Sequence, residues 1–276
     1  MSTQKLLSSC FAFVLMFAVA LDAADVRLGV KAGEKMTLTV NGIDYTFCWC
    51  PAGEFAMGSP ASETDRDEGE HQHRVVLTHG FWLLETEVTQ QMWTSVMGTS
   101  IRDQCTKSGG RWVTAAGDRF PIYYVNWEEA AAFCGKISAL SGQDIGLPTE
   151  AQWEYACRAG TKGRFAGAEK LSEMGWYTEN SDSQVHEVKT KKPNAWGLYD
   201  MHGNVYEWCS DWFGDYSFQP KTDPVGAEDG LTHVYRGGCW DSVERACRSA
   251  HRIKYPATSR LDYTGFRIII VPASNE

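Results

Sequence analysis

The residues from 126 to 160 read NWEEAAAFCGKISALSGQDIGLPTEAQWEYACRAG and contain the two strongest helix signals in the chain. The first helix is predicted to begin after Asn126, whose side chain can cap the first turn, and Gly142 is predicted to end it. The second is predicted to begin after Thr149, and Gln152 completes a capping box three residues later. Two helices joined by a short connection are therefore expected to pack against a sheet.

On either side of these helices the pattern changes to short strands and long loops. Residues 26–50 alternate apolar and polar side chains, and Asn41–Gly42 inside them is a strong hairpin signal. A third, short helix is predicted to begin after Thr89, and a Gly-rich polar insertion follows it over 98–121. No further helix is indicated towards the C-terminus. The chain is therefore predicted to be one α+β domain with small sheets and long loops.

Composition restricts the classes of function. The 276 residues include 11 Trp and 26 Gly, a combination typical of irregular backbone held in place by large rings. The net charge of −9, with no basic run, argues against a general nucleic-acid binder. We expect a monomer without nucleic-acid partners.

The N-terminal 24 residues have the features of an export signal. Lys5 provides a positive end, the apolar run Leu6–Leu21 follows it, and small residues then offer cleavage sites. This segment predicts a protein exported to the periplasm or the cell surface. Cys10 lies within a sequence that resembles a lipidation box, so a lipid anchor is the alternative and the only predicted contact with a membrane.

Eight cysteines remain once Cys10 is set aside. An exported protein can join an even number of cysteines into disulfides, but the sequence does not reveal their pairing. Cys48 and Cys50 point to one face of a strand, which is unfavourable for a bond between them. Small buried thiols are the alternative for most of these residues.

Seven motifs in a fixed order carry a resemblance to a known family. They are EFAMGS (54–59), ETEVTQQMW (85–93), YVNWEEAAAFC (124–134), LPTEAQWEYACRAG (147–160), PNAWGLYDMHGNVYEWCSDW (193–212), YRGGCW (235–240) and CRSAHR…TGFR (247–267). The series resembles the formylglycine-generating-enzyme, or sulfatase-modifying-factor, domain family. The resemblance implies a variant of the C-type lectin fold, with two helices and small twisted antiparallel sheets, over a single domain from 25 to 272.

The same resemblance extends to the variable proteins of diversity-generating retroelements, which bind ligands on this fold without catalysis. Their C-terminal segments mix frame residues with hypermutated contact positions, and residues 236–267 show a similar mixture. The retroelement systems mutate adenines, commonly in AAY codons, and such codons can yield every residue type except Trp, Lys, Glu, Gln and Met. Glu244 and Lys254 are therefore assigned to the frame. The predicted contact positions, all of reachable types, are Asp241, Ser242, Val243, His251, Ile253, Tyr255, Thr258, Ser259, Leu261, Asp262 and Tyr263. The alternative is an ordinary irregular loop.

The resemblance thus implies an exported, non-catalytic protein that binds an unidentified protein or surface ligand. The alternative function is that of a formylglycine-generating oxidase or a protein maturation factor. Such an oxidase needs two cysteines that bind one copper ion. In the enzymes the first of them follows the serine of a GGS motif by three residues, whereas here Cys239 replaces that serine and Ser242 stands three residues later. Cys247 has no matching place either, so neither copper nor catalysis is expected.

The resemblance also implies one disulfide and one metal ion. A bond between Cys157 and Cys247 is one option, and two free thiols are the other. The loop DMHGNVYEW (200–208) resembles a calcium loop of the formylglycine enzymes. By that likeness the side chains of Asp200 and Glu207 and the carbonyls of Gly203 and Val205 would hold one structural calcium ion. The alternative is that both carboxylates accept hydrogen bonds within the protein and no ion is needed.

Other combinations of polar residues favour structural roles. His71 and His73 lie in an acidic loop and could chelate a metal, but solvation is the more common state of such a pair. Glu150 and Glu154 share one helix face, and complementing the helix dipole is the favoured explanation for them.

Overall fold

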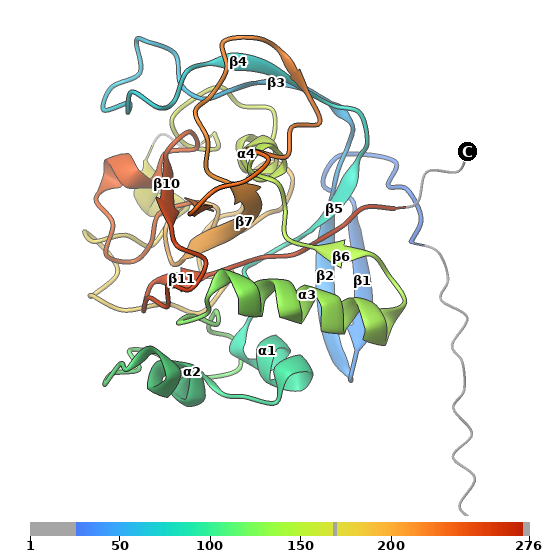
Figure 1. Ribbon diagram of the computed structural model, residues 1–276, viewed down its shortest axis with the longest axis vertical. Coiled ribbons are helices and arrows are strands. Elements are labelled where there is room, and N and C mark those ends of the chain that lie inside the picture. Colours follow the sequence, from blue (N-terminus) through green and yellow to red (C-terminus); the bar gives the residue numbers. More distant parts are fainter. Residues whose placement is uncertain (1–25, 168–169, 273–276) are drawn as a thin grey trace, which may run out of the picture.

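The computed structural model describes residues 26–167 and 170–272, which form three small sheets and four α-helices (Figure 1). The expected α+β class is confirmed. The predicted signal segment, including Cys10, lies outside the part of the chain that is described. Within that part, no helix combines the length and the apolar character needed to cross a bilayer.

The largest sheet has five strands and joins the beginning of the domain to its end. Its strand order is β1-β2-β5-β12-β6, so the last strand lies between two earlier ones. Asn41 and Gly42 form the turn of the first hairpin, as predicted, and both have positive φ (51° and 77°). The strands are β1 (Lys35–Val40), β2 (Ile43–Cys50), β5 (Phe81–Leu84), β6 (Ile145–Gly146) and β12 (Ile269–Ile270).

Two smaller sheets carry the remaining strands, and each includes one parallel pair, β7 with β11 and β4 with β8, where only antiparallel pairing was expected. The four-stranded sheet has the order β10-β9-β7-β11, and the three-stranded sheet has the order β3-β4-β8. Their strands are β3 (Gly53–Met57), β4 (His73–Leu77), β7 (Tyr206–Trp212), β8 (Lys221–Thr222), β9 (His233–Arg236), β10 (Arg252–Tyr255) and β11 (Thr264–Gly265).

Three of the helices begin at the caps that the sequence predicts. The side chains of Thr89, Asn126 and Thr149 each accept a hydrogen bond from a backbone amide in the first turn. The helices are α1 (Gln90–Met97), α2 (Ile101–Ser108), α3 (Trp127–Ser141) and α4 (Glu150–Arg158).

Helix α2 was not expected, because residues 98–121 were interpreted as an irregular insertion. Ser100 and Asp103 form a reciprocal capping box at its start, and Gly109 ends it in the left-handed conformation. The resemblance implied two helices, and the chain adds the short helices α1 and α2 to them. Two 3-10 turns, Leu171–Glu173 and Glu244–Cys247, are the only helical turns described after α4.

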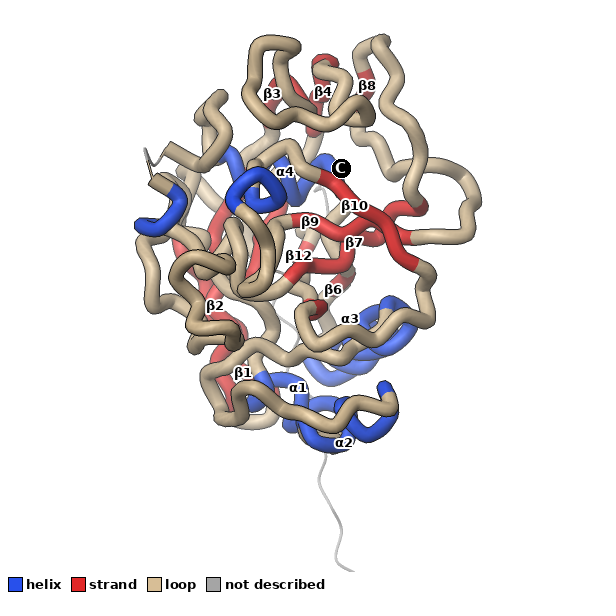
Figure 2. The backbone as a smooth tube through the Cα atoms, turned by 90° about the vertical axis from the view of Figure 1, so that its left-hand side faces the viewer, coloured by secondary structure: helices blue, strands red, loops and turns tan. Residues whose placement is uncertain are grey.

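Large rings hold the irregular parts of the chain in place, as the composition suggested. Trp82, Trp93, Trp153 and Trp208 are fully buried. The indole of Trp208 donates to the carbonyl of Val125, 83 residues away (2.9 Å), and so ties β7 to the start of α3. Loops and turns make up much of the chain outside the helices and strands (Figure 2).

Candidate functional site

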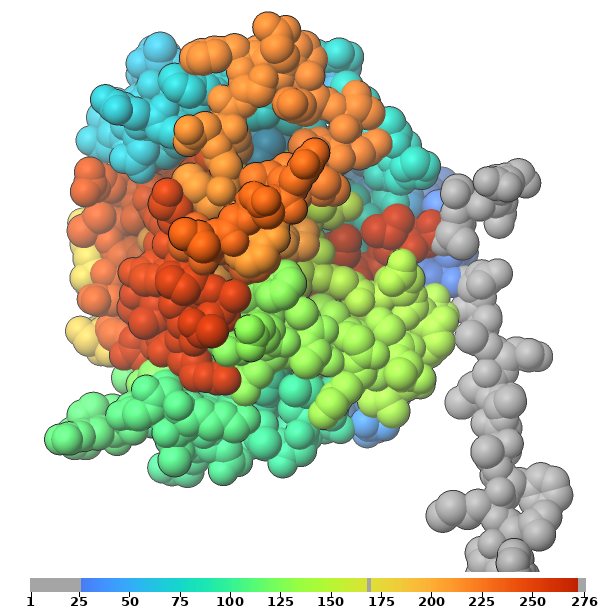
Figure 3. All heavy atoms as spheres, in the orientation of Figure 1, coloured from blue at the N-terminus to red at the C-terminus, as the bar shows by residue number. Residues whose placement is uncertain are grey.

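The C-terminal segment, residues 236–267, lies on one face of the molecule. It leaves β9, passes through a 3-10 turn, returns as β10 antiparallel to β9 and reaches β11 beside β7. Its red and orange atoms form a continuous patch between the β7–β9 loop above and residues 101–118 below (Figure 3). The C-terminal segment therefore contributes one continuous region of this face.

Two arginines at the beginning and middle of the segment are paired with helix α4. Arg236 donates to Glu154 and, through the same Nη2, to the carbonyl of Ser249 (3.1 Å). Arg252 donates through Nε and Nη2 to the two oxygens of Glu150 (2.8 and 2.6 Å). Both carboxylates therefore neutralise buried arginines of this segment, a role that the sequence did not indicate, and Glu150 also lies in the first turn of α4.

The other two buried arginines of the segment are paired with loops. Arg248 donates to both oxygens of Glu70 (2.7 Å each) and to Glu63 (2.8 Å), in the acidic loop before β4. Arg267 donates to both oxygens of Glu207 (2.6 Å each). All four arginine side chains are at most 4% exposed, and each is paired with a buried carboxylate. Glu154 also pairs with Arg158 of the same helix.

Glycine at position 238 is required by a close approach inside the segment. Its φ is +79°, and a Cβ atom there would lie 2.5 Å from Sγ of Cys247. The paired glycines of YRGGCW thus let the chain turn tightly over the 3-10 turn that follows.

Most of the predicted contact positions reach the solvent. Nine of the eleven are exposed or half-buried, and Ser242 and His251 are buried. The arginines Arg236, Arg248 and Arg267 of the same segment, in contrast, are completely buried. Of the two residues assigned to the frame, Glu244 is half-buried and Lys254 is exposed. The segment therefore combines a fixed interior with an accessible exterior, as the resemblance implied.

Tyrosines form the centre of this surface. The hydroxyl oxygens of Tyr255 and Tyr263 are 3.3 Å apart, and the rings of Tyr206 and Tyr263 meet edge to face at 6.1 Å. The ring of Tyr255 stacks on Tyr235, 5.2 Å between centroids. Tyr206 and Tyr235 were not among the predicted residues, because they lie on β7 and β9 outside the variable pattern.

Two carboxylates accompany the tyrosines. Asp241 is exposed, and Asp262 is half-buried. Burial raises the pKa of Asp262, and the charge of Asp241 raises it further, so the two lie close enough to repel each other. Neither forms an ion pair within the described chain, which leaves this part of the surface acidic.

Two predicted contact residues do not belong to this surface. The hydroxyl of Ser242 lies inside, 2.9 Å from the amide of Cys239 and 3.4 Å from the hydroxyl of Tyr206. His251 faces the acidic loop, with Nε2 3.5 Å from a carboxylate oxygen of Asp67, and burial lowers its pKa to about 4. These two assignments are corrected, because a pattern of residue types does not report burial.

The cysteines of the segment are buried thiols. Cys239 is 3% exposed and Cys247 is fully buried, and burial raises the pKa of the Cys239 thiol to about 12. All eight cysteines in the described part of the chain are free, so the option of a Cys157–Cys247 disulfide is wrong. His202 contacts both residues, since its Nε2 is 3.7 Å from Sγ of Cys157 and its Nδ1 is 2.8 Å from the carbonyl oxygen of Cys247.

The loop 200–208 fits the expected calcium site only in part. Asp200 is buried, and its Oδ1 has no hydrogen-bond partner, as a free ligand atom would. Glu207, however, already accepts three hydrogen bonds, two from Arg267 and one from the indole of Trp153 (2.7 Å). Gly203 and Val205 are also buried here. Glu87, a buried residue outside the predicted set that lies near Asp200, also has one oxygen, Oε2, without a partner. No cluster of three or more metal-binding side chains occurs among the described residues.

The two histidines of the acidic loop do not meet as a chelating pair. His73 is buried, and its Nδ1 is 2.9 Å from the carbonyl oxygen of His71. The ring of His71 instead lies 4.4 Å from that of Phe218. Ring packing therefore accounts for both.

Comparison of the sequence with known proteins gives a family match and several similar proteins. The family of the sulfatase-modifying factor enzyme 1-like domain matches residues 39–271. The chain is 34% identical over 222 residues to serine/threonine-protein kinase pkn1 of Chlamydia pneumoniae, covering 72% of this chain and 34% of that protein. It is 29% identical to a formylglycine-generating enzyme of Streptomyces coelicolor, over 79% of this chain and 86% of the enzyme.

Among solved structures, the chain is similar to Treponema denticola variable protein 1, with a TM-score of 0.76 and 30% identity over 86% of this chain and 99% of the other. This likeness confirms the expected C-type-lectin-like architecture. The chain spans only about a third of the length of the kinase relatives that it matches.

Proposed function

This chain belongs to the family of sulfatase-modifying factor enzyme 1-like domains, and we propose that within it the protein is a non-catalytic ligand-binding protein. Its contact residues lie in the C-terminal segment, residues 236–267, on a C-type lectin scaffold. The ligand is a protein or another surface molecule. The similarity to a variable protein of Treponema denticola supports this proposal.

One observation carries the proposal: the frame of the segment is fixed from inside while its outer positions are free to vary. Four buried arginines are each paired with a carboxylate from a distant part of the chain. The exposed positions between them, such as Asp241 and Thr258, take no part in those pairs. Since exposed substitutions away from a core usually change stability little, such a surface can carry many sequences.

The surface has the chemistry of a protein-binding site. Tyr255 and Tyr263 offer large rings with polar tips and few rotatable bonds, which lowers the entropy lost on binding. Asp241 and Asp262 add negative charge that is not neutralised within the described chain. This combination favours a partner that presents basic side chains.

The thiols of the segment support a non-catalytic role. A copper-thiolate site needs two accessible thiolates. Cys239 and Cys247 are both buried, and burial raises the pKa of each thiol. Ser242 stands where the enzymes have their first copper-binding cysteine.

The alternative, an oxidase or maturation factor, is suggested by the enzyme relatives and is tested directly. The purified chain is incubated with copper and a sulfatase-type cysteine peptide, with the Streptomyces coelicolor enzyme as positive control. We expect no formylglycine by mass spectrometry; formation of the aldehyde would overturn the proposal. In the genome, a template repeat and a reverse transcriptase gene beside this gene are expected, and a locus without them would argue against diversification.

We also propose that the protein is exported to the cell surface or the periplasm. The apolar run that follows Lys5 supports this location. N-terminal sequencing of the mature protein should find cleavage near residue 24. Labelling with radioactive palmitate would instead identify a lipid anchor at Cys10.

A further inference from the structure

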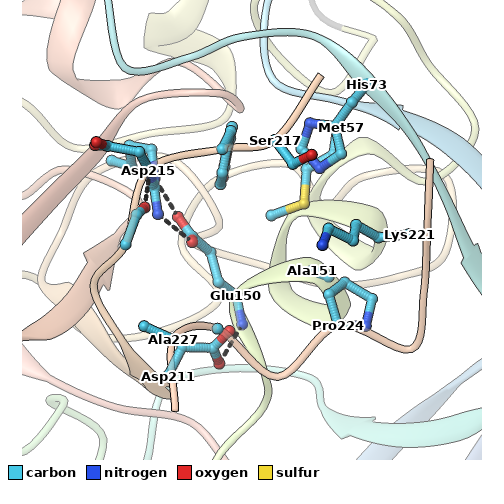
Figure 4. Close-up of a pocket in the computed structure, with 14 residues that line it drawn as sticks. Met57, His73, Glu150, Ala151, Asp211, Asp215, Ser217, Lys221, Pro224 and Ala227 are labelled. Carbon is cyan, nitrogen blue, oxygen red and sulfur yellow. Dashed lines mark hydrogen bonds and ion pairs between the residues drawn. The ribbon is translucent and has the colours of Figure 1, made fainter. Parts of the chain in front are cut away.

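A pocket of about 280 Å³ lies beside the C-terminal segment, between the start of α4, the end of β7 and strand β8 (Figure 4). It is separate from the tyrosine surface described above. Its volume is close to the lower limit of about 300 Å³ for ligand pockets, which suits a metabolite of a few heavy atoms.

Asp211 is a buried acid in this pocket without a cation of its own. It is 4% exposed, and its Oδ2 accepts hydrogen bonds from the amide of Glu150 (2.8 Å) and the hydroxyl of Ser210 (3.1 Å). The nearby guanidinium of Arg252 is already engaged with both oxygens of Glu150. No ion pair of Asp211 occurs in residues 26–167 and 170–272.

The second oxygen of Asp211 has no partner. Among the described residues no hydrogen-bond donor reaches Oδ1, although Asp211 lines the pocket. Gly226 packs closely against one side of this carboxylate, because a Cβ added there would lie 2.6 Å from Cβ of Asp211 and 3.0 Å from Oδ1. Burial raises the pKa of Asp211 to about 7, and the charge of Glu150 contributes to the rise. Buried carboxylates are normally paired, so a cation from outside the chain would complete this one.

Lys221 provides the opposite charge on another wall. It belongs to β8, and in Figure 4 its ammonium group points towards the middle of the pocket. Across the described chain it forms no ion pair and donates no side-chain hydrogen bond. Asp211, at the lower edge of the same view beside Ala227, forms no ion pair with it.

The walls between these charges are mostly apolar. Met57, Ala151 and Pro224 contribute aliphatic atoms, and the thioether of Met57 hangs into the pocket in Figure 4. The rings of His73 and Tyr216 meet edge to face at 4.8 Å on one side. Glu150 and Arg252 also line the pocket but are paired with each other, and Asp215 is an exposed carboxylate at its edge. Asp211 and Lys221 are therefore the buried acid and the base of this pocket that lack a partner, with a short apolar surface between them.

We propose that this pocket binds a small zwitterion, such as a free aliphatic α-amino acid, whose ammonium group contacts Asp211 and whose carboxylate contacts Lys221. The side chain of the ligand then packs against Met57 and Pro224. Asp211 and Lys221 form no ion pair with each other, whereas a ligand with an ammonium group and a carboxylate can pair with both. The proposal does not depend on what the C-terminal segment binds.

Titration calorimetry on the full chain tests this inference with L-leucine and L-valine as probes. Two matched compounds each lack one charge: N-acetyl-L-leucine has no ammonium group, and isopentylamine has no carboxylate. We expect saturable binding of at least one amino acid, and binding of the matched compounds weaker by about tenfold or more. No saturable binding of either amino acid at millimolar concentration, or equal binding of the matched compounds, would overturn the inference.

Three variants locate the site. Lys221→Met and Asp211→Asn should each weaken amino-acid binding by about tenfold or more, and asparagine can still accept the hydrogen bond from the amide of Glu150. Lys136→Met, at an exposed lysine of α3 away from the pocket, should leave it unchanged. Circular dichroism confirms folding. Unchanged affinity in both pocket variants would show that the amino acid binds elsewhere and would refute the assignment.

Discussion

Glu150 and Arg252 lie 102 residues apart and form a two-point ion pair, in which Nε and Nη2 of the guanidinium are 2.8 and 2.6 Å from the two carboxylate oxygens. Both side chains are 4% exposed. The pair joins the first residue of α4 to the first residue of β10. The position of the C-terminal segment therefore depends on a helix far away in the sequence.

Replacing Glu150 by Gln should destabilise the protein strongly. The change leaves the buried charge of Arg252 without its carboxylate, and breaking a buried pair in this way costs about 3–5 kcal/mol. Glu54→Gln is the matched control, because its pair with Arg74 is exposed on both sides and should contribute about 1 kcal/mol or less. Urea unfolding measures both; similar midpoints for the two variants would contradict the structural role of the pair.

Substitutions at outer positions of the segment should cost little. Asp241→Ala and Thr258→Ala remove exposed side chains outside the frame, and each should change the free energy of unfolding by about 0.5 kcal/mol or less. Arg248→Met leaves the buried Glu70 unpaired and should cost about 3–5 kcal/mol. A loss of stability in Asp241→Ala as large as that in Arg248→Met would refute the separation of frame and surface.

The stability of the ligand-free protein should depend on Asp211 between about pH 4 and pH 7. Burial, assisted by Glu150, raises the pKa of Asp211 to about 7 in the folded state, from 3.8. Folding therefore favours the protonated acid. Its stabilising contribution is complete below the unfolded pKa and is lost as the pH rises through the folded pKa.

Asp211→Asn should remove this dependence. The free energy of unfolding of the variant, relative to the unsubstituted protein, should increase from pH 4 to pH 8 by on the order of a few kcal/mol. Chemical denaturation at a series of pH values provides the measurement. A constant difference between the two proteins over that range would show that Asp211 has an ordinary pKa.

Calcium, if bound, should act through Asp200. We predict that calcium raises the Tm by a few degrees relative to a chelator, because the free oxygen of Asp200 gains a ligand bond. Asp200→Asn should abolish that difference. Glu207→Gln should lower the Tm equally with and without calcium, since it breaks the pair with Arg267. An unchanged Tm on chelation would end the prediction.

The thiols of the folded chain should be reduced and inaccessible. Cys157 and Cys247 are fully buried, and burial raises the pKa of the Cys157 thiol to about 12. A thiol reagent should react slowly with the native protein and rapidly after denaturation, and a reducing agent should not change the Tm. A clear decrease in the Tm on reduction would contradict this prediction and would support a disulfide between these residues.

The local features of the chain could be predicted from the sequence, because they depend on neighbouring residues. Thr89, Asn126 and Thr149 cap helices where the sequence placed them, and Asn41–Gly42 forms the predicted turn. Ser100 and Asp103 have the spacing of a capping box, but helix α2 was not predicted because its residues are mostly polar. The ordered motifs identified the family and the general position of the C-terminal segment.

The tertiary structure alone decided which residues of that segment are accessible and which partners hold it. Ser242 and His251 have the residue types of contact positions, yet packing against Tyr206 and the acidic loop buries them. Glu150 and Glu154 looked like helix-end charges until the fold placed Arg252 and Arg236 beside them. Burial and ion pairing depend on atoms brought together from distant parts of the chain. A pattern along the sequence does not specify which distant residues come into contact.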